Sequence, residues 1–130
     1  MSRSLWPNFA SLAVPRGMTE MLYDAASDIG VQTNGAIDFY VDAVGLKVSG
    51  AISEIRHNCY LRVVKTGYTH LLFRVTTPVV GPFPAVAATP EGEEFPDLKD
   101  ESELRGAIEK ILRRERTKEI VLYLLHTNPK

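Results

Sequence analysis

The chain is short of cysteine, of long apolar runs and of excess charge, and each shortage excludes a class of protein. Cys59 is the single cysteine among 130 residues, so no internal disulfide can form, as is typical of a protein of the reducing cytoplasm. No apolar run reaches the roughly 18 residues of a membrane-spanning helix. Pro7, Asn8 and Ser11 interrupt the apolar residues near the start, where a signal peptide would need a continuous segment. We therefore expect a cytoplasmic protein with no membrane partner.

The charge of the chain is almost balanced. Lys and Arg number 15 and Asp and Glu number 16, which gives a net charge of -1. A dedicated nucleic-acid binder usually carries a basic excess, so we expect no nucleic-acid partner. Near-neutral charge leaves little repulsion between copies, which favours a homo-oligomer or a protein partner. With 45% apolar residues, the 130-residue chain is long enough for one domain with a real core.

Familiar catalytic and cofactor-binding motifs are also missing from the sequence. It contains no Gly-x-Ser-x-Gly elbow, no Gly-x-x-x-x-Gly-Lys-Ser/Thr phosphate loop and no Gly-x-Gly-x-x-Gly dinucleotide motif. Cys59 and the histidines His57, His70 and His126 are candidate metal ligands, but structural zinc usually needs about four ligands in closely spaced pairs. We predict no catalytic residue, no cofactor and no metal.

Two charged segments in the second half of the chain are interpreted as solvated surface. Glu93 and Glu94 lie in a stretch rich in Pro and Gly, 89–96, where a mobile loop could not hold two carboxylates in a fixed geometry. The basic run 113–118 falls at the end of a predicted helix, where cations suit the helix dipole, and Glu115 interrupts it.

A β-hairpin organises the middle of the chain. Its arms are 59–64 and 69–75, and a loop at 65–67 places Gly67 where a three-residue loop needs a left-handed residue. This loop length pairs Leu61 with Leu71, and a slip of one residue would move every side chain of a strand to the other face.

The register divides the hairpin side chains between two faces. The apolar face, which we expect the helices to cover, would carry Cys59, Leu61, Val63, Leu71, Phe73 and Val75. The opposite face would carry Tyr60, Arg62, Val64, Tyr68, His70, Leu72 and Arg74. Arg62 would then lie across from His70, and Asn58 across from Arg74.

The rest of the chain supplies further strands and flanking helices. Apolar residues recur at helical spacing in 18–29. Strands are expected at 36–45, at 46–55 and, as an edge strand of small residues, at 83–88. Asp100 to Glu103 has the spacing of a capping box before a helix. The segment 118–126 is apolar all round, and we prefer a short helix starting at Thr117 to a central strand.

The expected fold class is therefore α+β, with an N-terminal helix, an antiparallel meander of four to five strands, and one or two C-terminal helices packed on one sheet face. We divide the chain into an apolar arm (1–16), a single domain (17–126) and a frayed tail (127–130). The arm either packs along its own domain or reaches a second subunit.

The outward face of the hairpin is the candidate functional surface. The predicted binding residues are Tyr60, Arg62, His70, Leu72 and Arg74. The strand at 36–45 would add Asp38, Tyr40 and Asp42 to the same face. Such a mixture suits a ligand or a symmetric dimer contact, and it also occurs on an ordinary solvated sheet.

We predict a small binding domain that self-associates through this face. The alternative is a small-molecule-binding or hydrolytic enzyme with a site between the sheet and the 78–96 loop, in which His70, Arg62 and Arg74 supply the polar groups.

Overall fold

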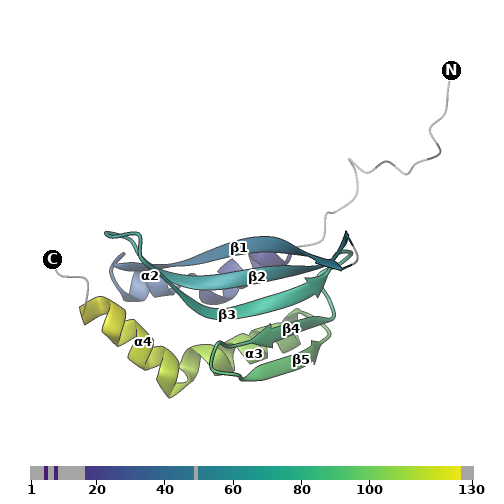
Figure 1. Cartoon of the computed structure of the whole chain (residues 1–130). Coiled ribbons are helices and arrows are strands. Elements are labelled where there is room, and N and C mark those ends of the chain that lie inside the picture. The colour runs from purple at the N-terminus through teal and green to yellow at the C-terminus, as the bar shows by residue number, and fades with distance from the viewer. Residues whose placement is uncertain (1–4, 6–7, 9–16, 49, 127–130) are drawn as a thin grey trace.

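A computed structural model describes residues 5, 8, 17–48 and 50–126 of the chain. The helices are α1 Met18–Ala26, α2 Ile29–Gln32, α3 Glu101–Arg113 and α4 Glu115–His126. The strands are β1 Ile37–Val48, β2 Ala51–Val63, β3 Thr69–Pro78, β4 Ala85–Ala88 and β5 Glu94–Leu98. They form one antiparallel five-stranded sheet in the order β1-β2-β3-β4-β5 (Figure 1). The predicted fold class is confirmed.

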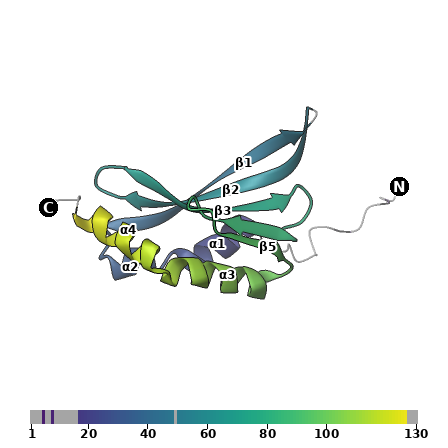
Figure 2. The ribbon, with the colours of Figure 1, turned by 60° about the horizontal axis from the view of Figure 1, so that its bottom comes forward.

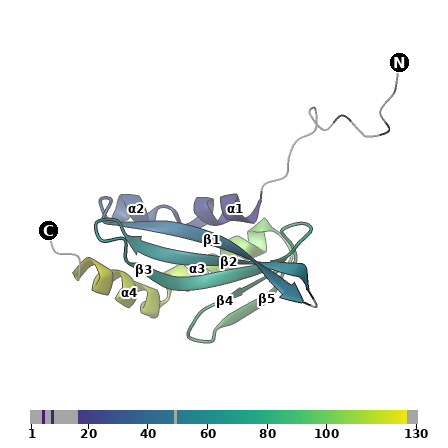
Figure 3. The same ribbon diagram turned by 45° about the horizontal axis from the view of Figure 1, so that its top comes forward.

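The four helices lie on one side of the sheet (Figure 2). α1 and α2 pack along β1, while α3 packs beneath β4 and β5, and α4 continues from α3 beside β3 (Figure 3). None of the described elements covers the opposite side of the sheet, which we call the outer face. The covered side is the inner face, and it carries Cys59, as expected.

The core forms between the inner face and the helices. The rings of Phe39 and Phe73 stack with centroids 6.1 Å apart, and Tyr23 from α1 meets Phe39 edge-on at 5.6 Å. Ala85 and Ala87 of β4 are fully buried where α3 packs against the strand. Because these side chains are small, the helix can approach the sheet closely.

The hairpin register is only partly as predicted. Cys59 does pair with Phe73, but Leu61 pairs with His70 instead of Leu71. The loop is one residue longer than expected, because the backbone N–H of Val63, not that of Val64, bonds to the carbonyl of Tyr68 (2.8 Å).

A β-bulge then corrects this offset along β3. The register shifts between Cys59 and Tyr60 of β2, which leaves Leu72 as the extra residue between Leu71 and Phe73. Leu72 and Phe73 are both fully buried on the inner face, whereas Leu71 lies opposite Tyr60 on the outer face. The predicted faces of Leu71 and Leu72 are therefore wrong, and the bulge is the reason.

Two strand boundaries also differ from the prediction. β1 continues through Gly45 to Val48, and β2 starts at Ala51, so the expected strand at 46–55 is divided between β1 and β2. Gly50, with φ of +83°, lies at the turn between them. The 83–88 strand is not an edge strand, because β5 forms where an acidic loop was expected and pairs with β4.

The C-terminal segment is helical, as preferred. Asp100 caps α3, since its side chain accepts a hydrogen bond of 2.9 Å from the backbone N–H of Glu103. Arg114 has an extended backbone, which separates α3 from α4. Thr117 is not the cap of α4, because its hydroxyl donates to the carbonyl of Ile111 at 2.6 Å.

The predicted arm (1–16) and tail (127–130) lie outside the described residues, apart from Leu5 and Asn8. None of the described helices is long and apolar enough to cross a membrane.

Candidate functional site: the outer face of the sheet

The structure places three of the predicted binding residues on the outer face and two elsewhere. Tyr60, Arg62 and Arg74 point outward, as the register requires. Leu72 is 0% exposed and belongs to the core. His70 lies opposite Leu61 on the inner face and lines a cleft beside α4. The bulge explains both corrections, because it moves the start of β3 by one residue.

An apolar row crosses the middle of the outer face. Tyr40 on β1 lies opposite Tyr60 on β2, and Tyr60 lies opposite Leu71 on β3. The two tyrosine rings are 6.1 Å apart and tilted by 45°. Large, partly exposed rings of this kind supply contact area with little loss of side-chain entropy when a partner binds.

One flank of this row is held by an ion pair. The guanidinium of Arg62 donates from Nε and Nη2 to the two carboxylate oxygens of Asp38, at 3.0 and 2.8 Å. The same guanidinium lies 5.0 Å from the centre of the Tyr40 ring. The hydrogen bond with Asp38, then its charge, raises the pKa of Arg62 above its usual value. Because both groups are partly exposed, the pair orients these side chains more than it stabilises the fold.

The other flank is polar and less well satisfied. Asp42, Asn58 and Arg74 lie in one row across β1, β2 and β3, and Arg56 lies in the next row opposite Thr76. The Nε atoms of Arg56 and Arg74 are buried, and neither has an acceptor among the residues that the structure describes. A buried donor without a partner costs about 1–3 kcal/mol, so this flank is less well stabilised than the flank that carries the Asp38–Arg62 pair.

Charge is separated across the outer face. β1 contributes the carboxylates of Asp38 and Asp42, while Arg56, Arg62 and Arg74 lie on β2 and β3. The sequence prediction missed Arg56, because the expected strand ended at residue 55 and the hairpin arm began at residue 59. The alternation of outward residues in the hairpin arm continues through Asn58 to Arg56, and following it would have found this residue.

The remaining chemically versatile residues are buried on the inner face. His57 is 6% exposed, and its Nδ1 lies 3.2 Å from the carbonyl of Val75. Burial lowers the pKa of His57, and the contact with Val75 opposes that shift. Burial raises the pKa of the Cys59 thiol, so this side chain is a protonated core residue and not an activated nucleophile.

The structure does not assemble the alternative enzyme site. Arg62 and Arg74 point away from the helices, whereas His70 points toward α4. These three polar groups therefore lie on opposite sides of the sheet, and the geometry gives them no common substrate.

The basic run 113–118 is not uniformly solvated, which corrects the sequence interpretation. The Arg114 side chain is 11% exposed and lies 2.8 Å from Glu91 and 2.7 Å from Glu93 in the β4–β5 loop. Its Nε donates to the hydroxyl of Thr117 at 2.9 Å. Desolvation opposes the shift, but the hydrogen bond and charge of Arg114 lower the pKa of Glu91 overall. This cluster joins the loop to the α3–α4 junction.

In comparisons with protein-family models, with curated proteins and with solved structures, nothing matched the chain. Within the described ranges, no group of three or more His, Cys, Asp or Glu side chains could hold a metal ion.

Proposed function

We propose that the protein is a cytoplasmic binding domain that forms a symmetric dimer through the outer face of its sheet. The observation that carries this proposal is the separation of acidic side chains on β1 from basic side chains on β2 and β3, along an apolar row that crosses all three strands. In a two-fold interface the same patch serves on both copies, so the patch must be complementary to itself.

The strand order supplies such complementarity. With a two-fold axis along β2, β1 of each copy would face β3 of the other copy. Asp42 would then meet the other copy's Arg74, and the apolar row would pack on its counterpart. A carboxylate from the second copy would pair with the guanidinium of Arg74, whose buried Nε has no acceptor among the described residues.

A charge exchange tests this arrangement. Asp42→Arg and Arg74→Asp should each shift the protein toward the monomer mass in sedimentation velocity, because each places like charges together at the interface. The double variant should restore the dimer. Asp42 and Arg74 lie two strands apart, about 10 Å, within one chain, so restoration requires contact between copies.

Two control variants separate the interface from the fold. Leu71→Asp changes the apolar row and should also give monomers, whereas Arg113→Asp on α3 should leave the mass unchanged. A wild-type chain that sediments as a monomer at all concentrations would refute the proposal, as would a double variant that stays monomeric.

A further inference from the structure

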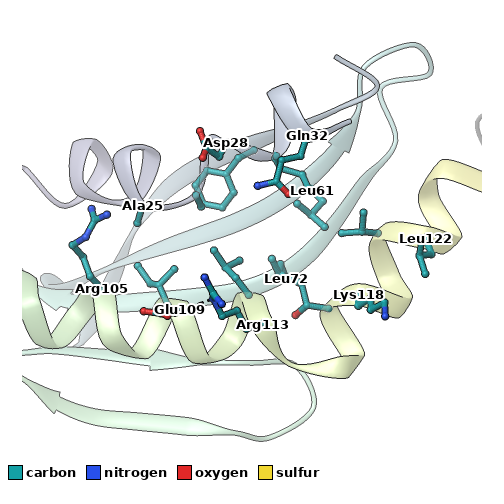
Figure 4. A pocket seen from close by; sticks show the side chains of 17 residues that line it. Ala25, Asp28, Gln32, Leu61, Leu72, Arg105, Glu109, Arg113, Lys118 and Leu122 are labelled. Carbon is teal, nitrogen blue, oxygen red and sulfur yellow. Dashed lines mark ion pairs between the residues drawn. The ribbon is translucent and has the colours of Figure 1, made fainter. Parts of the chain in front are cut away.

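The helical layer does not close over the inner face. α1 packs against α3, but α2 and α4 diverge. A groove of about 560 Å³ opens between the α1–α2 segment on one side and the α3–α4 segment on the other (Figure 4). Binding sites in proteins typically measure about 300–1,000 Å³, so the groove is large enough to hold part of a ligand or a segment of a partner.

The floor and one wall of the groove are apolar. Phe39, Leu61 and Leu72 of the sheet form the floor, and Ile108 of α3 lies beside them. These residues are almost completely buried, so they offer little surface to a bound molecule. The residues of the groove walls supply most of the surface that such a molecule would contact.

α4 carries a second apolar stripe that its own domain covers only in part, because Val121 packs against the core while Leu122 and Leu125 are exposed. Ile120 and Leu124 are buried against the core. Val121, Leu122 and Leu125 follow at helical spacing on a different side, where Leu122 is 56% and Leu125 is 37% exposed. Val121 and Leu122 line the groove. The exposed side chains of Leu122 and Leu125 therefore offer apolar contact to a packing partner.

The rim of the groove on α3 and α4 is basic apart from Glu109, and the facing wall contributes one carboxylate, Asp28. Arg105, Arg113 and Lys118 all line the groove, and Figure 4 shows them along one wall. Arg113 pairs with Glu109 at 3.4 Å, whereas Arg105 and Lys118 have no carboxylate partner within the described part of the chain. At about 1.5 Å per residue, Arg105 and Arg113 are about 12 Å apart along α3.

We propose that this groove binds an amphipathic α-helix of a protein partner. The apolar stripe of the partner helix lies against Val121 and Leu122, and its acidic flank faces Arg105 and Lys118. Docking of an amphipathic helix by its apolar face into a hydrophobic groove is a common mode of peptide recognition. The groove is on the helical side of the sheet, so the proposal is independent of dimerisation through the outer face.

A designed peptide tests the proposal. The probe is a labelled helical peptide of about 14 residues with leucines at helical spacing and glutamates beside them, and binding is followed by fluorescence anisotropy. A matched peptide with lysine at each glutamate and a scrambled peptide of equal composition serve as controls. The acidic amphipathic peptide should bind, and both controls should bind at least about tenfold more weakly.

Protein variants locate the binding site. Leu122→Asp and the double variant Arg105→Glu/Lys118→Glu should each weaken peptide binding by about tenfold or more, because the first removes buried apolar contact and the second reverses the rim charge. Asp42→Arg on the outer face should bind the peptide as the wild type does, even where it abolishes the dimer.

Three outcomes would overturn the inference. The first is equal binding of the acidic and the scrambled peptide, and the second is unchanged binding by the Leu122→Asp variant. The third is a chain that binds a single-chain anionic amphiphile such as dodecanoate at this groove but not the acidic peptide, which would make the site one for a small ligand.

Discussion

Replacing Arg114 by methionine should destabilise the protein far more than the same replacement of its neighbour Arg113. Arg114 is 11% exposed and contacts two carboxylates of the β4–β5 loop. Arg113 is 81% exposed and makes one i,i+4 pair with Glu109. The two residues are adjacent in sequence and identical in type, so the comparison isolates the effect of their surroundings.

The expected magnitude follows from the exposure of the partners. Removing one member of a fully buried ion pair costs about 3–5 kcal/mol, whereas an exposed pair contributes about 0–1 kcal/mol. Glu91 and Glu93 are partly exposed and can regain water, and Nη2 of Arg114 is already buried without an acceptor among the described residues. We therefore expect a loss of about 2 kcal/mol for Arg114→Met and less than about 0.5 kcal/mol for Arg113→Met.

Urea unfolding followed by circular dichroism measures both values. For a chain of this size, the Arg114→Met loss corresponds to a fall of about 6–10 °C in Tm. Equal losses for the two variants, or a loss below about 0.5 kcal/mol for Arg114→Met, would refute the reasoning that burial gives this cluster its strength.

Buried residues of the inner face give three more predictions. Because burial keeps the pKa of His57 low in the folded protein, the unfolded chain binds the proton first, so stability is lost as pH falls below about 6.5. His57→Gln should reduce this slope in urea titrations near pH 6, and an unchanged slope would assign it to other groups. Cys59 should react with Ellman's reagent only after unfolding, and rapid reaction in native buffer would contradict its burial. Ala87→Leu should cost about 1–3 kcal/mol in the same unfolding assay, because α3 leaves no space, whereas Ala51→Leu at an exposed site should change stability by less than about 0.5 kcal/mol.

Local patterns predicted the fold well. The capping box at Asp100, the helical spacing from Met18 and the placement of Cys59 against the core all depend on residues close together in sequence. The face that each hairpin arm presents also followed from alternation, except near the loop.

The hairpin error has a specific cause. Leu71 and Leu72 are adjacent and identical, so alternation does not say which of them faces the core. Which of the two leucines faces the core depends on the loop length and on the bulge. The spacing of apolar residues does not reveal either feature. His70 moved to the inner face for the same reason.

Long-range pairing accounts for what the sequence did not reveal. Arg114 reads as part of a solvated basic run because its partners, Glu91 and Glu93, lie more than twenty positions away. The groove likewise depends on the divergence of α2 and α4, which no local pattern encodes. Of the five predicted binding residues, only Tyr60, Arg62 and Arg74 lie on the outer face, as the alternation indicated.

The bulge in β3 leaves one residue of the hairpin, Leu72, without a partner on β2. Pairing without the bulge would place Leu71 opposite Leu61 and would leave 65–67 as a three-residue loop, with no change of sequence. Leu71 would take over the core position of Leu72, and the neighbouring His70 would turn outward with the new alternation. A slip of one residue would thus exchange one leucine for another in the core while presenting a titratable imidazole on the outer face, so the two adjacent leucines let this strand tolerate a slip that would expose a core residue in an ordinary hairpin.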